Sequence, residues 1–139
     1  MIIFETYGPR DWRKKLIQAI AQKQRSGGTL TIVASDPVMD FAHIDDIVAA
    51  YIQAAYLLGN SPADVSGHSY ALTGGERQPI SELIKIFEKI GGKLISTEKK
   101  EDSPGTKRIL VPWSGPVLPG WQAKVSLRSG IKQFLEDIK

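Results

Sequence analysis

The chain has 139 residues and no cysteine, is 42% hydrophobic and 24% charged, and carries a formal net charge of +3. This composition is that of one globular domain with a buried core, and it excludes disulfides, thiol nucleophiles and thiolate metal sites. No apolar run approaches the roughly 18 residues that span a bilayer, and the first residues lack the basic lead of a signal peptide. We therefore expect a cytoplasmic protein that makes no membrane contact.

The chain opens with a predicted strand, helix and two further strands. Asp11 is placed to cap the helix at its N-terminus, and Gly27-Gly28 is placed to end it. The expected elements are a strand at residues 2–6, a turn at Tyr7-Gly8-Pro9, a helix from residue 11 to about residue 25, and strands at residues 29–33 and 38–42.

The clearest predicted helix covers residues 46–58. Its apolar side chains recur at spacings of three and four, which predicts one wide stripe packed in the core. Tyr51 belongs to this stripe, so we expect its side chain in the core. Asp45 or Asp46 is expected to cap the helix, because free N–H groups and the helix dipole favour a carboxylate there. The stripe consists of Ile44, Ile47, Val48, Tyr51, Ile52, Ala55 and Leu58.

The second half of the chain predicts two more helices. Ser81 and Ser126 are each placed to cap one of them, and each helix carries apolar residues on one face. The expected elements are a strand at residues 69–73, a helix from residue 81 to about residue 90, a weak strand at residues 94–97, a polar proline-rich segment at residues 99–120 with a short apolar run at 109–111, and a final helix after residue 126.

The segment MDFAHIDD, residues 39–46, places one histidine among three carboxylates. A metal site would need further imidazole or oxygen ligands, and His68 is the only other histidine. A histidine general base remains an alternative, but no nucleophile stands near it in the sequence. We therefore interpret the segment as a strand-to-helix junction, in which His43 packs locally and Asp40 anchors a turn.

Basic residues cluster at positions 10–15, 99–100 and 107–108. Proteins that read duplex nucleic acid combine a basic stripe with a recognisable motif, and the sequence contains no such motif, so we expect no nucleic-acid partner. The clusters suit a small polyanion such as a nucleotide diphosphate, and solvated helix faces and loops are the alternative explanation.

Motifs for phosphate binding and catalysis are missing. The pairs Gly27-Gly28, Gly74-Gly75 and Gly91-Gly92 match neither the dinucleotide fingerprint nor the P-loop, and helix or strand termination explains each pair better. The sequence also contains no Tyr-x-x-x-Lys and no Gly-x-Ser-x-Gly. On its own residues, the chain presents no complete catalytic constellation.

Four stretches in order resemble one family. Tyr7-Gly8-Pro9 is similar to its Asn-Val-Tyr-Gly-Pro, and MDFAHIDDIVAAYIQAA is similar to its Arg-Asp-Phe-Val-His-Val-Asp-Asp-Val-Ala-x-Ala. GHSYALTGGERQPISELIKIF resembles Gly-x-x-Tyr-Asn-Ile-Gly-Gly-Gly-Glu-x-x-Ser-Ile-x-Glu-Leu, and PGWQAKVSLRSGIKQFL resembles the closing Leu-Gly-Trp-x-Pro-x-x-Ser-Leu. The family is the extended short-chain dehydrogenase/reductases, in their NAD-dependent epimerase/dehydratase group, and the similarity spans almost the whole chain.

The resemblance implies the fold class α/β: a small mixed α+β substrate-binding lobe that lacks most of the Rossmann domain. Residues 1–139 would form the C-terminal substrate-binding domain, with residues 1–10 as the last strand and turn leaving the absent Rossmann domain. A complete protein would bind NAD or NADP, whereas this chain, without the Gly-x-Gly-x-x-G and Tyr-x-x-x-Lys motifs, would hold no cofactor and would not catalyse by itself.

The resemblance also implies substrate-binding positions. The family has a diphosphate-binding arginine where this chain has Met39, and a substrate-contacting asparagine where it has Glu5. Lys99 and Lys100 stand where the family has another basic residue. Tyr7 is placed to stack on a ligand or to pack in the turn. Arg10, Lys14 and Lys15 are placed to compensate in part, in diphosphate binding, for the departures at Met39 and Glu5. The expected ligand is a nucleotide sugar.

Two alternatives remain from the sequence. One is a truncated module that binds or interacts without catalysis, and the other is the lobe of a dehydrogenase for an apolar alcohol, to which Met39 is suited. Since Ile2, Ile3 and Phe4 form a strand that needs neighbours, we also expect an exposed docking surface through which the chain self-associates.

Overall fold

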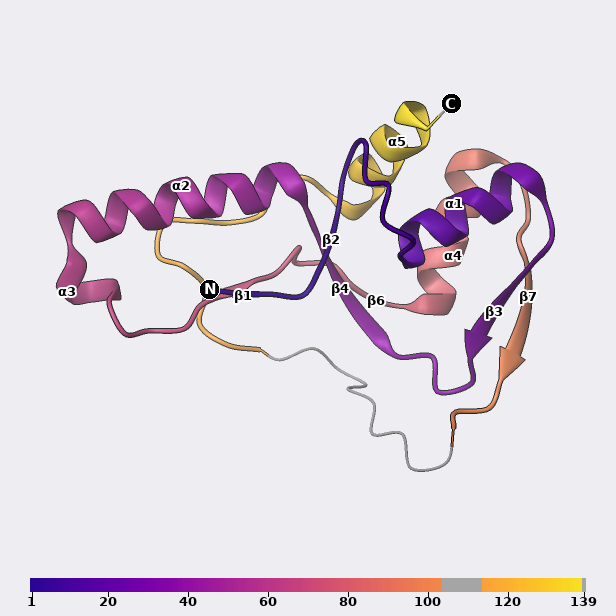
Figure 1. The fold of residues 1–139 in the computed structure, drawn as a ribbon, viewed down its shortest axis with the longest axis horizontal. Coiled ribbons are helices and arrows are strands. Elements are labelled where there is room, and N and C mark those ends of the chain that lie inside the picture. The colour runs from indigo at the N-terminus through magenta and orange to yellow at the C-terminus, as the bar shows by residue number, and fades with distance from the viewer. Residues whose placement is uncertain (104–113, 139) are drawn as a thin grey trace.

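The computed structural model of the chain describes residues 1–103 and 114–138 (Figure 1). The basic pair at 107–108 and the apolar run at 109–111 lie outside the described residues. The fold is a small mixed α+β domain, as the sequence predicts. Its helices are α1 (Leu16–Ser26), α2 (Ile44–Asn60), α3 (Pro62–Val65), α4 (Ile80–Gly91) and α5 (Leu127–Asp137).

The described strands pair in three small sheets. The first sheet joins β1 (Ile2–Ile3) and β5 (Ala71–Leu72) in parallel, and the third joins β3 (Thr29–Val33) and β7 (Ser96–Lys100) in parallel. The middle sheet has the order β2 (Glu5–Tyr7), β4 (Val38–His43), β6 (Arg77–Pro79), with β2–β4 parallel and β4–β6 antiparallel.

The molecule is elongated, with α2 at one end and α1, α4, β3 and β7 at the other (Figure 1). One hydrophobic cluster lies between α1, α4, α5 and the strands β3 and β4, around residues such as Phe87 and Phe134. A second cluster lies beneath the first half of α2, where Ile47 and Ala50 pack with Leu72, Leu118 and Trp121. Strand β4 runs between the two clusters and contributes Phe41 to one and Ala42 to the other.

The predicted cap of α1 is wrong. The helix begins at Leu16 rather than near Asp11, its N-cap position is Lys15, and that residue makes no side-chain cap among the described contacts. The Asp11 carboxylate instead binds Arg13. The end at Gly27 is confirmed, and both Gly27 and Gly28 have positive φ, which favours glycine.

The predicted cap of α2 is also wrong. The N-cap is His43, whose Nδ1 accepts a hydrogen bond from the Asp45 backbone N–H at 3.3 Å. Asp46 points inward instead, with 4% of its surface exposed. Its carboxylate accepts the backbone N–H groups of Lys124 at 2.9 Å and Val125 at 3.0 Å. Asp46 therefore anchors a distant segment.

The predicted burial of the α2 stripe is only partly confirmed. Ile47 is buried, but Ile44, Val48, Tyr51, Ile52 and Leu58 are exposed, with exposed fractions from 41% for Ile44 to 67% for Ile52. The expectation that Tyr51 lies in the core is wrong, since 52% of it is exposed. The helix turns a narrower face to the core, in which the small side chain of Ala50 allows close approach.

Of the two serine caps predicted for α4 and α5, the cap of α5 is confirmed and the cap of α4 is wrong. Ser126 caps α5 as predicted, because its hydroxyl accepts the Ser129 backbone N–H. Ser81 does not cap α4; its backbone N–H and its hydroxyl both donate to the carboxylate of Asp36, 45 residues away in the chain. Strand β6 was not predicted from the sequence. Strand β5 is shorter than the strand expected at residues 69–73, and β7 begins and ends later than the strand expected at residues 94–97. Within the described residues, no helix combines the length and hydropathy that a membrane crossing requires.

Asp46→Ala should lower the free energy of unfolding by about 1–3 kcal/mol, because it removes the buried carboxylate that accepts two partly buried backbone N–H groups. Asp45→Ala is the matched control: the Asp45 side chain is 76% exposed, and its loss should cost less than about 1 kcal/mol through the helix dipole. Urea unfolding of both variants measures the difference. Equal midpoints would contradict the anchoring role of Asp46.

Candidate functional site

The basic and apolar candidates Lys99, Lys100 and Met39 lie near one edge of the fold. Lys100 pairs with Val33 at the end of β3, and the Ala34 backbone N–H donates to the Lys100 carbonyl. The connection from β3 then leads to β4, where Met39 is the second residue. The ends of β3 and β7 and the start of β4 lie together along this edge (Figure 1).

The side chains at this edge differ in exposure. Both lysines are exposed, as is every residue of β7, so their ammonium groups are open to an anion. Met39 is partly buried and packs against the first hydrophobic cluster. The edge thus presents two exposed positive charges at successive positions of β7, whose side chains point to opposite faces of the strand pair, while the Met39 side chain packs inward.

Tyr7 lies apart from this edge, at the end of β2. Its side chain is 2% exposed and packs edge-on against Phe41 and His43, with ring centroids 6.3 and 5.3 Å away. Burial raises the pKa of the Tyr7 phenol above its ordinary value, and the charges of Glu76 and Asp46 raise the pKa further. This packing favours the turn-packing alternative for Tyr7 over ligand stacking.

Arg10 adopts a positive φ of 59° in the loop after β2. Its backbone N–H donates to the Asp137 carboxylate at 2.5 Å, which ties the loop to the end of α5. The residue itself is exposed. The structure therefore separates Tyr7 and Arg10, at the end of β2, from Met39, Lys99 and Lys100 at the strand edge.

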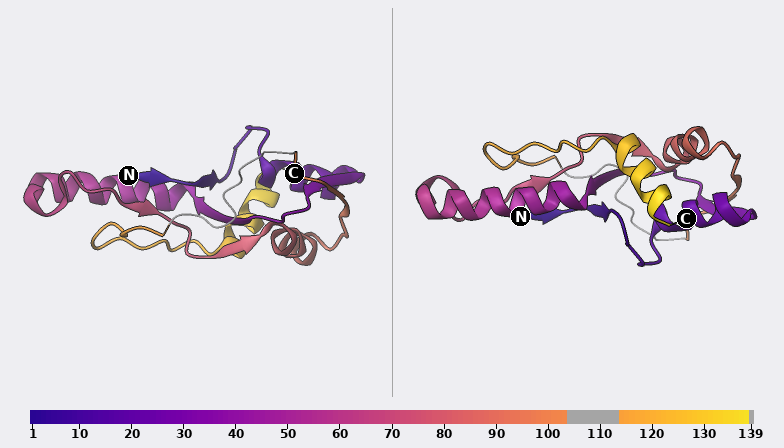
Figure 2. Two further views of the ribbon diagram at one scale, coloured as in Figure 1. Left: turned by 90° about the horizontal axis from the view of Figure 1, so that it is seen from below. Right: turned by 90° about the horizontal axis from the view of Figure 1, so that it is seen from above.

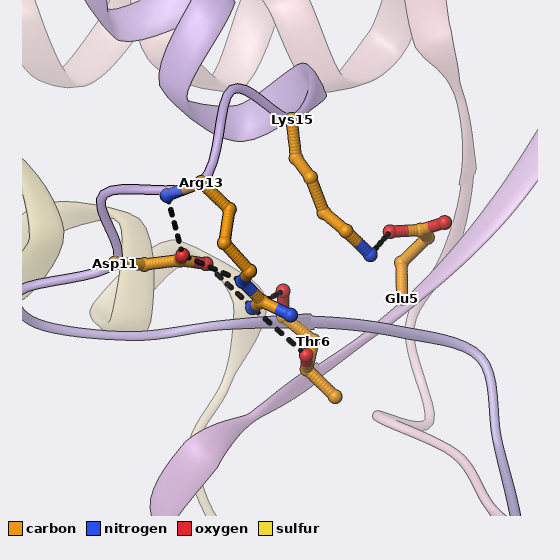
Figure 3. A network of polar contacts seen from close by, with 5 residues as sticks. All are labelled: Glu5, Thr6, Asp11, Arg13 and Lys15. Atoms are coloured by element: carbon orange, nitrogen blue, oxygen red, sulfur yellow. Dashed lines mark hydrogen bonds and ion pairs between the residues drawn. The ribbon is translucent and has the colours of Figure 1, made fainter.

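A polar network, which the sequence did not predict, fixes this loop to β2 (Figure 3). The Arg13 guanidinium donates to both carboxylate oxygens of Asp11, each at 2.7 Å, and to the carbonyl and hydroxyl oxygens of Thr6 at 3.1 and 3.0 Å. The hydrogen bond from Arg13 lowers the pKa of the Asp11 carboxyl. Because its donors have these protein acceptors, Arg13 acts first as a clamp on the loop.

The charge of Glu5 is offset within the chain. Lys15 Nζ lies 2.9 Å from Glu5 Oε2, and both side chains are partly exposed (Figure 3). This ion pair was not predicted from the sequence. No periodic spacing marks this pair, since the partners lie ten residues apart across a loop.

Asp40 is the anchor of the β5–β6 turn. Its carboxylate accepts the Thr73 hydroxyl at 2.5 Å, the Gly74 N–H at 2.8 Å and Arg77 Nε at 3.1 Å. Glycine is required at position 74, because a Cβ there would lie 1.8 Å from the Phe41 carbonyl oxygen. The Gly74-Gly75 pair therefore serves close backbone packing.

The other glycine pairs have similar structural roles. Gly27-Gly28 follows α1, and Gly91 packs against the Gln24 side chain at the end of α4. Since neither pair precedes the first turn of a helix, the glycine pairs do not form a dinucleotide cradle. Across the described ranges 1–103 and 114–138, no group of three or more acidic or histidine side chains is arranged to hold a metal ion.

The pockets of the described surface include two that lie close to the turns of the middle sheet, and neither is lined by Lys99 or Lys100. One of about 180 Å³ is bordered by Thr6, Tyr7, Asp11 and Arg13, beyond the carboxyl end of β2. The other, of about 440 Å³, lies between the residue 73–76 turn and residues 121–126. The Glu76 carboxylate at its border accepts a hydrogen bond from the Leu127 backbone N–H and so has a structural role.

Solved structures share this fold over nearly the whole chain. UDP-glucuronic acid 4-epimerase from Bacillus cereus, solved with UDP-glucuronic acid and NAD, is 23% identical with a TM-score of 0.82, and the match covers 98% of this chain and 43% of that one. RMD from Pseudomonas aeruginosa, complexed with NADPH, is 21% identical with a TM-score of 0.75, and the match covers 97% of this chain and 46% of that one.

The sequence comparison gives a weaker match. A putative GDP-L-fucose synthase from Arabidopsis thaliana is 30% identical over 107 residues, which cover 74% of this chain and 30% of that protein. No family model matches the sequence. The chain therefore has the fold of the epimerase/dehydratase group of extended short-chain dehydrogenase/reductases, and it spans less than half the length of these proteins.

Arg13→Met should raise the pKa of the Asp11 carboxyl toward its ordinary value of 3.8. A lowered pKa stabilises the fold above pH 3.8, and this contribution is lost as the pH falls through the lowered value. Carbonyl carbon NMR of Asp11 measures the shift directly. Arg13→Lys should give an intermediate pKa, since lysine lacks the bidentate fork; an unchanged pKa in Arg13→Met would contradict the clamp.

Proposed function

We propose that the chain is the substrate-binding lobe of an NAD(P)-dependent enzyme that acts on nucleotide sugars, an epimerase, dehydratase or reductase. The observation that supports this proposal is the fit of 98% of the chain to an epimerase solved with UDP-glucuronic acid and NAD. The match covers 43% of that epimerase, so the proposal assigns this chain to substrate binding and the hydride chemistry to the cofactor of a complete protein.

The strand edge supplies the groups that a nucleotide diphosphate needs. Lys99 and Lys100 offer two exposed ammonium groups, which attract phosphate as point charges. The Lys15 ammonium pairs with the Glu5 carboxylate, so Glu5 does not confront an incoming diphosphate as an unpaired charge. In this proposal the lysines bind the diphosphate, while Met39 contributes an apolar contact in place of a charge.

The role of the β2 loop is to shape the lobe. Arg13 and Asp11 fix it to Thr6, and Arg10 ties it to α5 through its backbone. The exposed Arg10 side chain then contributes positive charge at that end of β2.

A dehydrogenase lobe for an apolar alcohol is the second candidate. The partly buried Met39, where the resemblance places an arginine, is the observation that favours it. Such a substrate would carry no diphosphate, so Lys99 and Lys100 would not contribute to its binding. The two functions thus differ in their dependence on these lysines.

Titration of the 139-residue chain with UDP-glucuronic acid, followed by backbone amide NMR, should perturb residues 32–39 and 98–100, whereas NAD should perturb none. Lys99→Ala/Lys100→Ala should weaken nucleotide-sugar binding about tenfold, because each lost phosphate contact removes a charge-assisted interaction. Lys89→Ala/Lys132→Ala is the matched control, with the same loss of charge at exposed positions on α4 and α5.

The apolar-alcohol candidate gains if UDP, GDP and dTDP sugars perturb nothing at millimolar concentration. Equal weakening by both lysine pairs would also reject the proposed site, since it would indicate a general electrostatic effect. Micromolar NAD binding by the isolated chain would contradict the assignment of cofactor binding to another domain.

A further inference from the structure

Two neighbouring helices carry rows of positive charge on their solvent side. Helix α4 and the loop after it contribute Lys85, Lys89 and Lys93, and α5 contributes Arg128 and Lys132. All five residues are exposed. Because helix positions four apart lie on the same face, the cations of each helix form a column. We call these five residues the basic columns.

Two grooves join the basic columns to one another. The larger groove, of about 480 Å³, lies between the end of α4 and the start of α5, and its charged lining residues are Lys89, Arg128 and Lys132. The smaller groove, of about 350 Å³, is bordered by Lys85, Lys89 and Lys93. Because Lys89 borders both grooves, the positive surface continues from one helix to the other.

The acidic residues nearby neutralise little of this surface. Glu82 pairs with Lys85 at 2.7 Å. Glu88 borders the smaller groove, and its carboxylate accepts the Ile95 backbone N–H at 2.8 Å. Glu136 stands one turn beyond the α5 column and borders neither groove. In the described part of the chain, the other four cations of the basic columns form no ion pair.

An exposed apolar side chain adjoins the basic columns. Leu94 is 89% exposed and borders the smaller groove. Helices α4, in salmon, and α5, in yellow, lie side by side in both views of Figure 2, and α4 lies on the side of the molecule opposite β1. The surface therefore combines several unpaired cations with one apolar contact point.

We infer that the basic columns and Leu94 bind an acidic helical segment of a partner protein, which lies along the groove between α4 and α5. Glutamates four residues apart on such a helix have Cβ atoms about 5–6 Å apart, which matches the spacing of the cations within each column. An apolar side chain between the glutamates can contact Leu94. This surface goes beyond the proposed function, which does not use it.

The arrangement disfavours other anionic partners. Lys85 and Lys93 are eight positions apart, about 12 Å along a helix, so one free phosphate cannot contact both ends of the column. Duplex nucleic acid offers phosphates but no apolar group in its backbone for Leu94. An anionic membrane would require a larger apolar face than a single leucine provides.

The test uses a synthetic peptide of repeated Glu-Leu-Ala-Ala units, whose glutamates recur every four residues. Its titration into the 139-residue chain, followed by backbone amide NMR, should perturb residues 85–94 and 126–132. Lys89→Ala/Arg128→Ala should weaken binding about fivefold or more, because each substitution removes a contact between opposite charges. Lys23→Ala/Lys124→Ala is the matched control, with the same loss of charge outside both grooves, and should change binding less than about twofold.

Leu94→Ser separates this surface from general attraction between charges. The substitution leaves the net charge unchanged and removes the apolar contact, so peptide binding should weaken while the amide spectrum remains that of the folded chain. Unchanged binding by Leu94→Ser, equal weakening by both charge variants, or no perturbation of residues 85–94 and 126–132 would overturn the inference.

Two further arms of the titration distinguish the partner. Duplex DNA or phosphatidylserine vesicles that perturb the same amides at a lower concentration than the peptide would overturn the protein partner and assign the basic columns to nucleic acid or to a membrane. None of these measurements uses a nucleotide sugar. Failure of the proposed function therefore leaves this surface standing, and failure of peptide binding leaves the proposed function standing.

Discussion

Two buried carboxylates, Asp40 on β4 and Asp46 in the first turn of α2, hold distant segments of the chain to the centre of the fold. Asp40 accepts hydrogen bonds from the β5–β6 turn, and Asp46 accepts them from residues 124–125. Both carboxylates are almost fully buried. A buried charge is stable only when it is fully hydrogen-bonded, so each carboxylate fixes the segment that satisfies it.

This arrangement determines what the lobe presents to the outside. Strand β4 is fixed between two hydrophobic clusters, and its end leads directly into α2 through the His43 cap. Lys99 and Lys100 pair with the end of β3, which precedes β4 in the chain. The end of β7 is exposed and basic, whereas residues 47–60 of α2 carry no charge and include exposed apolar side chains. In the proposed function, the basic strand edge binds the diphosphate.

The sequence predicted the elements better than their contacts. The periodicity of α5 and its Ser126 cap are local, and both are confirmed. The caps of α2 and α4 could not be predicted in the same way, because Asp46 turns toward residues 124–125 and Asp36 reaches Ser81 from a distant turn. The apolar residues of α2 recur at helical spacing, as predicted, but this periodicity does not show whether other residues of the chain bury their side chains. Likewise, no sequence motif indicated that Lys99 and Lys100 lie apart from Tyr7 in the folded chain.

Amide hydrogen exchange of the 139-residue chain tests the central claim most directly, namely that the two buried carboxylates organise the lobe. The N–H groups of Gly74, Lys124 and Val125 lie outside helices and strands, yet each donates to one of these carboxylates. The account predicts that these three amides exchange as slowly as the core of α4. Fast exchange at neutral pH in a folded chain would contradict it.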